Sequence, residues 1–203
     1  MTTARPRLVV LISGTGTNLQ ALLDASASGG LPAAIGAVIS NRPGAPGLER
    51  ARRAGVPALT LVKERSQDRR AYDANLADLV AAARPDWVIL AGWMRLLSSA
   101  FLDRFPGRVV NLHPALPGAF PGVDAIARAH AAFQRGEITH TGAMVHLVPD
   151  EGVDNGPVLA RAVVPIELDD SVETLAARVH AVEHRLLVET VARLVRSEGV
   201  PEA

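Results

Sequence analysis

The sequence predicts an α/β fold built on an open, doubly wound and mostly parallel sheet. Short apolar runs rich in β-branched residues alternate with helix-spaced segments through the first half, as parallel strands joined by right-handed crossovers do. A glycine-rich turn follows the first of these runs and opens the first helical segment, which is typical of a Rossmann-type sheet. Two strand-like segments close together in the second half predict a mixed, partly antiparallel edge, and a long C-terminal helix follows them.

The expected strands are short and apolar. The run LVVLI at 8–12 contains no polar residue, which indicates a strand covered on both faces. In chain order we expect strands at 8–12, 34–40, 58–62, 87–91, 108–112, 142–148 and 158–164.

The expected helices show apolar residues at helical spacing. We place them at 18–25, 47–54, 68–83 and 125–133, followed by a long helix that begins at Asp170. Asp170 is the expected N-cap of this helix, with Glu173 completing a capping-box-like pair. The apolar face of the long helix is formed by Val172, Leu175, Val179, Val182, Leu186 and Leu194, and the end of the chain at 197–203 is expected to be loose.

Composition limits the function classes. The chain has 203 residues and no cysteine, so we expect one domain over 1–203 without disulfides, a thiolate metal site or a cysteine nucleophile. Its 21 basic and 21 acidic residues give no net charge, and only seven residues are aromatic (2 Trp, 1 Tyr, 4 Phe), which argues against nucleic-acid binding. The N-terminal apolar run is too short for a membrane span. We therefore expect a cytoplasmic protein without a membrane partner.

The turn SGTGTN predicts a phosphate site. A helix N-terminus offers free backbone N–H groups, and Gly16, Thr17 and Asn18 stand at that position. A tight turn without a ligand is the alternative. A dinucleotide is less well supported, because Leu19 replaces the third glycine of its fingerprint and the second strand ends in Ser-Asn rather than in an acidic residue.

Asn111 and His113 are the strongest candidates for catalysis. Residues two apart on a strand point to the same face, so an amide and an imidazole project together where such sheets hold their chemistry. Together they could stabilise a developing oxyanion. Asp154, in the turn PDEGVDNGP, is expected to approach His113 and raise its pKa. Structural roles at a strand end and in a turn are the alternatives.

The chain resembles the phosphoribosylglycinamide formyltransferases, folate-dependent enzymes of purine synthesis. The resemblance rests on blocks spread along the chain: VVLISGTGTNLQALLDA, AVISNRPGAPGLERA, AGWMRLLS, VVNLHPALPGAFPG, TGAMVHLVPDEGVDNGP and ARVHAVEHRLL. It implies a formyltransferase-like fold and transfer of the formyl group of 10-formyltetrahydrofolate to the amine of phosphoribosylglycinamide, without a metal. The protein would act on these small molecules as a monomer or homodimer.

The resemblance also implies residue roles. The catalytic residues would be Asn111, His113 and Asp154, and the substrate phosphate would bind Gly16, Thr17 and Asn18. Glu183 would lie on the glycinamide side of that substrate. The folate site would be lined by Arg69, Met94, Arg95, Leu96, Leu97 and Asn111. The N-terminal half would thus hold the phosphate substrate and the C-terminal half the folate. The sequence departs from the family pattern in the loop 115–120 and at Met144.

Three alternatives are weaker. A formyltetrahydrofolate hydrolase usually carries an N-terminal regulatory domain, whereas the first strand is expected near residue 7 here. A nicotinamide-dependent reductase lacks support from the glycine-rich turn. His180, Glu183 and His184 match the zinc-peptidase pattern H-x-x-E-H, but only 19 residues remain after His184 to supply a third ligand. We also expect His130, His140 and His146 to be surface or packing residues.

Overall fold

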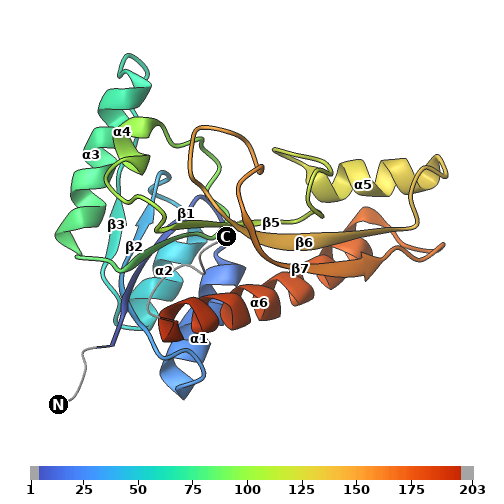
Figure 1. The fold of residues 1–203 in the computed structure, drawn as a ribbon, viewed down its shortest axis with the longest axis horizontal. Coiled ribbons are helices and arrows are strands. Elements are labelled where there is room, and N and C mark those ends of the chain that lie inside the picture. Colours follow the sequence, from blue (N-terminus) through green and yellow to red (C-terminus); the bar gives the residue numbers. More distant parts are fainter. Residues whose placement is uncertain (1–4, 198–203) are drawn as a thin grey trace.

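A computed structural model describes residues 5–197, so most of the predicted loose tail lies outside the described residues. The structure contains a seven-stranded sheet with the strand order β3-β2-β1-β4-β5-β6-β7 (Figure 1). This order is that of a doubly wound sheet with two added strands at one edge. No helix within residues 5–197 has both the length and the apolar character that a membrane crossing needs.

The strands lie close to their predicted positions. Their bounds are β1 Arg7–Ile12, β2 Ala34–Ser40, β3 Ala58–Thr60, β4 Trp87–Leu90, β5 Val109–His113, β6 His140–Leu147 and β7 Val158–Pro165. The first five strands pair in parallel, whereas β6 pairs antiparallel with both β5 and β7. The mixed edge predicted from the two adjacent C-terminal strands is therefore confirmed.

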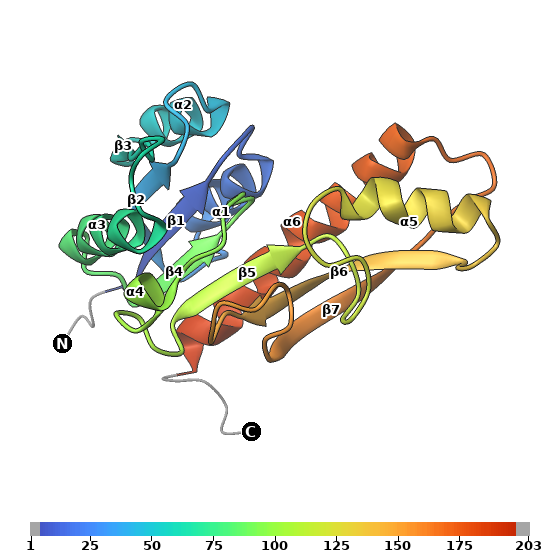
Figure 2. The same ribbon diagram turned by 90° about the horizontal axis from the view of Figure 1, so that it is seen from above.

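The helices cover both faces of the sheet. Their bounds are α1 Thr17–Ser28, α2 Pro46–Arg53, α3 Arg69–Ala82, α4 Ser99–Leu102, α5 Ala125–Gln134 and α6 Val172–Arg196. The short helix α4 was not predicted from the sequence, because one turn is too short to show helical periodicity. The predicted long C-terminal helix is confirmed as α6. Helix α5 lies beside β6, at the end of the molecule far from α3 (Figure 2).

Alternation along β1 divides the core into two layers. Leu8, Val10 and Ile12 pack with α1, α2 and α6 on one face. Val9 and Leu11 pack with α3 and α4 on the other face. Since successive strand residues point to opposite faces, a run without polar residues is what a doubly covered strand requires.

The sheet reverses its winding between β1 and β4. The loops that follow these two strands are joined by hydrogen bonds: the Ser13 N–H donates to the Gly92 carbonyl at 3.0 Å, and the Met94 N–H donates to Ser13 Oγ at 2.8 Å. Ligands of open α/β sheets bind beyond the carboxyl ends of the strands at such a switch point. The predicted phosphate turn and the segment 94–97 therefore lie next to each other.

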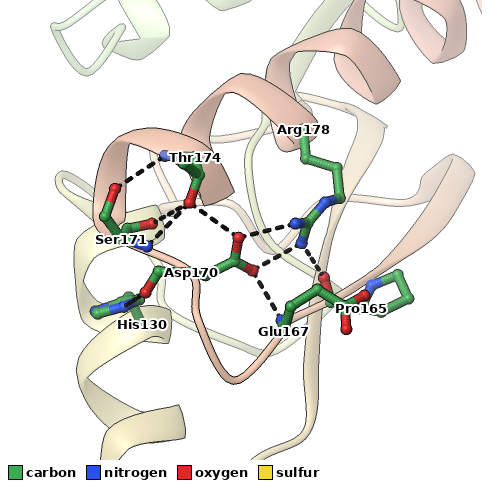
Figure 3. A network of polar contacts seen from close by, with 7 residues as sticks. All are labelled: His130, Pro165, Glu167, Asp170, Ser171, Thr174 and Arg178. Carbon is green, nitrogen blue, oxygen red and sulfur yellow. Dashed lines mark hydrogen bonds and ion pairs between the residues drawn. The ribbon is translucent and has the colours of Figure 1, made fainter.

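The capping residues predicted for α6 are wrong. The N-cap is Ser171, which forms a capping box with Thr174, one residue beyond the predicted pair of Asp170 and Glu173. Asp170 instead accepts two hydrogen bonds of 2.8 Å from the Arg178 guanidinium and one from the Glu167 N–H (Figure 3). A bidentate arginine is a stronger partner for a carboxylate than a helix N-terminus alone. Asp170 therefore joins the end of β7 to α6.

We expect the substitution Asp170→Asn to lower the melting temperature (Tm) at pH 7 by several degrees. The bonds from Arg178, Glu167 and Thr174 hold the pKa of Asp170 at about 2, below its ordinary value of 3.8. The folded-state pKa is depressed, so this stabilisation is complete above pH 3.8 and disappears as the pH falls through about 2. Thermal melts across this range test the prediction, with the exposed neighbour Asp169→Asn as control. A Tm difference that does not change with pH would contradict it.

Candidate active site

A cavity of about 800 Å³ opens beyond the carboxyl ends of β4 and β5. Loops that contain Gly122 and Asp154 form its other walls. Seven of the predicted site residues line it: Met94, Arg95, Leu96, Leu97, Asn111, His113 and Asp154. The structure therefore brings the predicted catalytic residues and most of the predicted folate-binding residues to one cavity.

Asp154 is the centre of the polar network in this cavity. Its Oδ1 accepts a hydrogen bond from Asn111 Nδ2 at 3.0 Å, its Oδ2 accepts one from the Gly122 N–H at 2.8 Å, and Oδ2 lies 3.2 Å from His113 Nδ1. Burial is the largest single influence on this carboxyl and raises its pKa. The contacts with His146, Gly122 and His113 outweigh burial, and the pKa of Asp154 lies below its ordinary value. Asp154 is therefore an ionised group that joins β5 to two loops.

His146 packs inside the protein, and it also joins the polar network of this site, which was not predicted from the sequence. It is buried and stands opposite Asn111 in the antiparallel pairing of β5 and β6. Its Nδ1 lies 2.7 Å from the Leu147 carbonyl, which can only accept, so Nδ1 carries a proton. In the neutral ring Nε2 accepts from Asn111 Nδ2 at 3.1 Å, whereas in the charged ring the Nε2 proton faces Asp154 Oδ1 at 3.5 Å. Only the register of β5 against β6 reveals this contact, and the sequence does not give that register.

When the His146 ring is neutral, Asn111 uses both amide hydrogens inside the protein. One donates to His146 Nε2 and the other to Asp154 Oδ1. As a donor to a substrate oxygen, Asn111 must exchange one of these partners when the substrate binds.

Burial lowers the pKa of His113 by more than Asp154 raises it, so the expected influence of Asp154 is present but the expected net rise is not. Burial is the largest influence and lowers the pKa of His113, while Asp154, the Phe120 carbonyl and Glu183 oppose it without reversing it. His113 Nε2 lies 3.1 Å from the Phe120 carbonyl. The desolvation cost of an imidazolium exceeds the attraction of the nearby carboxylate, so neutral His113 predominates at pH 7.

The glycine-rich turn starts α1 without a side-chain cap. Gly16 is the N-cap in a left-handed conformation (φ 71°), and a Cβ on Gly16 would lie 2.7 Å from the Gly47 Cα. Asn18 Oδ1 is buried without a hydrogen-bond partner, which is uncommon for a buried polar atom. Gly16, Thr17 and Asn18 are not among the residues that line the large cavity. They form a separate cradle of backbone N–H groups at the same end of the sheet.

Glu183 and Arg69 are not among the residues that line the cavity. Glu183 is buried on α6 and accepts a hydrogen bond of 2.6 Å from His180 Nδ1, which raises the pKa of His180. The charge of Glu183 also influences His113. Arg69 donates to Glu151, a residue of the cavity wall. Within the described part of the chain, no three His, Asp or Glu side chains gather in an arrangement that could hold a metal ion.

Comparisons with known proteins show the family to which the chain belongs. A family model described as formyl transferase matches residues 6–191. The chain belongs to the formyl transferase family. Among its relatives in this family is the phosphoribosylglycinamide formyltransferase of Schizosaccharomyces pombe, with 46% identity over 93% of this chain and 96% of the relative. The Escherichia coli protein of the same name is 42% identical over 88% of this chain and 82% of the relative.

Solved structures of formyl transferases share the fold. The crystal structure of glycinamide ribonucleotide transformylase 1 from Symbiobacterium toebii superposes with a TM-score of 0.91 at 44% identity, covering 98% of this chain and 91% of that one. The phosphoribosylglycinamide formyltransferase from Brucella melitensis gives a TM-score of 0.86 at 38% identity, covering 98% and 100%. The likeness thus includes β6, β7 and α6 as well as the parallel core.

Proposed function

We propose that the protein transfers the formyl group of 10-formyltetrahydrofolate to the amine of 5-phosphoribosylglycinamide. The products are formylglycinamide ribonucleotide and tetrahydrofolate, and the reaction is a step of purine biosynthesis in the cytoplasm. The observation that carries the proposal is the convergence of Asn111, His113 and Asp154 at one cavity. The names of the relatives along nearly the whole chain point to the same reaction.

His113 would move the proton in this reaction. Asp154, 3.2 Å from Nδ1, holds the single proton of the neutral ring on Nδ1, which leaves the Nε2 lone pair as the base. The contact of Nε2 with the Phe120 carbonyl must then open, because a lone pair and a carbonyl oxygen repel each other. As the amine attacks the formyl carbon, Nε2 takes the amine proton and later delivers it to the departing folate nitrogen.

Asn111 and the ionised Asp154 would stabilise the charges that develop. When the new carbon–nitrogen bond forms, negative charge gathers on the formyl oxygen, and Asn111 Nδ2 donates to it in exchange for His146 or Asp154. Asp154 stabilises the imidazolium that forms on His113. The carbon–nitrogen bond to the folate then breaks, and the negative charge on the formyl oxygen is released.

The remaining residues would bind the two substrates. The phosphate would accept hydrogen bonds from the backbone N–H groups of the cradle formed by Gly16, Thr17 and Asn18, and from the Nδ2 group of the Asn18 side chain. Exposed Met94 and Leu96 offer an apolar surface to the folate rings. Glu183 would face the glycinamide side. The phosphate substrate would thus bind mainly to the N-terminal half of the chain. The folate would bind both to the segment 94–97 and to the cavity loops of the C-terminal half.

A product assay tests the proposal against its rivals. The protein is mixed with phosphoribosylglycinamide and 10-formyltetrahydrofolate, and both formylglycinamide ribonucleotide and tetrahydrofolate are measured. We expect equal amounts of the two products, and no turnover of the folate when the amine substrate is omitted. Formate release without the amine substrate would indicate a hydrolase instead, and oxidation of a reduced nicotinamide would indicate a reductase.

A further inference from the structure

The loop 149–157 carries Asp154, and a second acidic residue attaches this loop to the body of the protein. Glu151 Oε2 accepts a hydrogen bond of 2.8 Å from Arg69 Nη2, and Glu151 Oε1 accepts one of 2.9 Å from the Ser99 N–H. Arg69 is the first residue of α3 and Ser99 the first residue of α4. One carboxylate therefore bridges the loop to two helix N-termini, where its charge is favourable.

The two helix N-termini that bind Glu151 are held in place by the buried residue Asp73. Asp73 on α3 is fully buried, and its Oδ2 accepts a hydrogen bond of 2.7 Å from the Ser98 N–H. The same oxygen lies 3.8 Å from Arg69 Nε. Asp73 thus holds the starts of α3 and α4 together and orients Arg69 toward the loop. Glu151 binds to a site that the folded core has already formed.

Asp154 needs such an attachment because of its backbone conformation. It has a φ of 51°, in the left-handed region that a residue other than glycine rarely adopts. Such a conformation persists only where the surroundings hold it. The Asp154 side chain is held by Asn111 and Gly122. When the loop is followed from Asp154 toward the N-terminus, Glu151 is the first residue whose side chain is hydrogen-bonded to a residue outside the loop.

We propose that Glu151 is a positioning residue, which fixes Asp154 against His113 by anchoring the loop 149–157 to α3 and α4. The catalytic part of this inference depends on the proposed function, whereas the anchoring does not. Glu151 and Arg69 have side chains that are 42% and 39% exposed, and exposed ion pairs add little to global stability. The effect of Glu151 is therefore local: it restricts the loop without deciding whether the chain folds.

Amide hydrogen exchange in the free protein tests the anchoring directly. In Glu151→Ala we expect exchange of the Ser99 amide and of the loop 149–157 to rise about tenfold, while Tm stays unchanged. Glu151→Gln keeps one acceptor oxygen and should give an intermediate rise. Glu137→Ala is the matched control, because it removes a glutamate from another exposed pair, with Arg135, and should leave this exchange unchanged. Unchanged exchange in Glu151→Ala would refute the proposal.

Two further measurements separate positioning from a merely structural role. The charge of Asp154 raises the His113 pKa, while His146 lowers it and Glu183 raises it. Loss of the anchor should therefore shift the NMR titration of His113 to lower pH without a change at His180. In the transfer assay we expect kcat to fall about tenfold and the KM for phosphoribosylglycinamide to stay the same. If the transfer activity itself is absent, exchange and titration still decide the anchoring. A normal His113 titration would show that Glu151 does not act through Asp154.

Discussion

Asn111→Ala is expected to lower kcat for formyl transfer by about a hundredfold or more, because the formyl oxygen loses a hydrogen-bond donor as its negative charge develops. The loss should appear in kcat more than in KM, since this donor acts mainly in the transition state. Steady-state kinetics with both substrates varied measure the effect. The variant also removes a partner from His146 and from Asp154, so its fold must be checked by thermal melting.

The control for this prediction is Asn75→Ala. Asn75 lies exposed on α3, so the same substitution is made there without touching the cavity. We expect normal kinetics for the control. If Asn111→Ala turned over at a near-normal rate, Asn111 would not be the oxyanion donor, and its role would be confined to holding Asp154 and His146.

We expect Asp154→Asn to lower kcat by about a hundredfold or more, as Asn111→Ala does, but for a different reason. The variant removes the charge that stabilises a protonated His113. An amide at this position can also present its N–H₂ group to Nδ1, and the proton of the neutral ring would then move to Nε2, where the base is needed. Both effects weaken proton transfer while leaving the cavity nearly the same size.

An NMR titration of the histidine side chains separates this prediction from simple damage to the site. Burial already lowers the His113 pKa, and Asp154 is the largest influence that opposes burial. The Asp154→Asn variant should therefore titrate His113 at a still lower pH, and Asp103→Asn, an exposed residue at the end of α4, should not. An unchanged His113 pKa in Asp154→Asn would exclude the electrostatic coupling between the two residues.

The pH dependence of stability follows from the same shift. Because the folded-state pKa of His113 lies below its ordinary value of 6.5, the unfolded chain binds the proton more readily. The stability contributed by neutral, buried His113 is present above pH 6.5 and decreases as the pH falls toward the folded-state pKa. The direction is opposite to that expected if Asp154 had kept His113 charged.

Much of the fold was predictable because it depends on local patterns. Uninterrupted apolar runs predicted strands covered on both faces, and apolar residues at helical spacing over 68–83 predicted the helix found as α3. The strand period of two placed Asn111 and His113 on one face, and both line the same cavity. These features follow from side-chain direction along a single element, so neighbours in the sequence are sufficient to specify them.

The candidate site was only partly predictable. Asp154 was predicted from its turn as a residue that approaches His113, and the resemblance also implied it. Glu183 was implied by the resemblance alone, and its contacts were not predicted. His146 was missed because its role depends on the register between β5 and β6, and Glu151 because its partners lie on α3 and α4. The cap of α6 was misplaced by one residue, because Asp170 has a better partner in Arg178.

The sequence alone thus determined the α/β class and the mixed edge, and it predicted the candidate catalytic residues. The tertiary structure decided which of them meet and which protonation state they favour. Asn111 and Asp154 are 43 positions apart, and Arg69 and Glu151 are 82 apart. Contacts at such separations depend on how the whole chain packs, and no local preference encodes them. The same holds for the His113 pKa, since burial is a property of the assembled core that a pair of residues read from the sequence does not reveal.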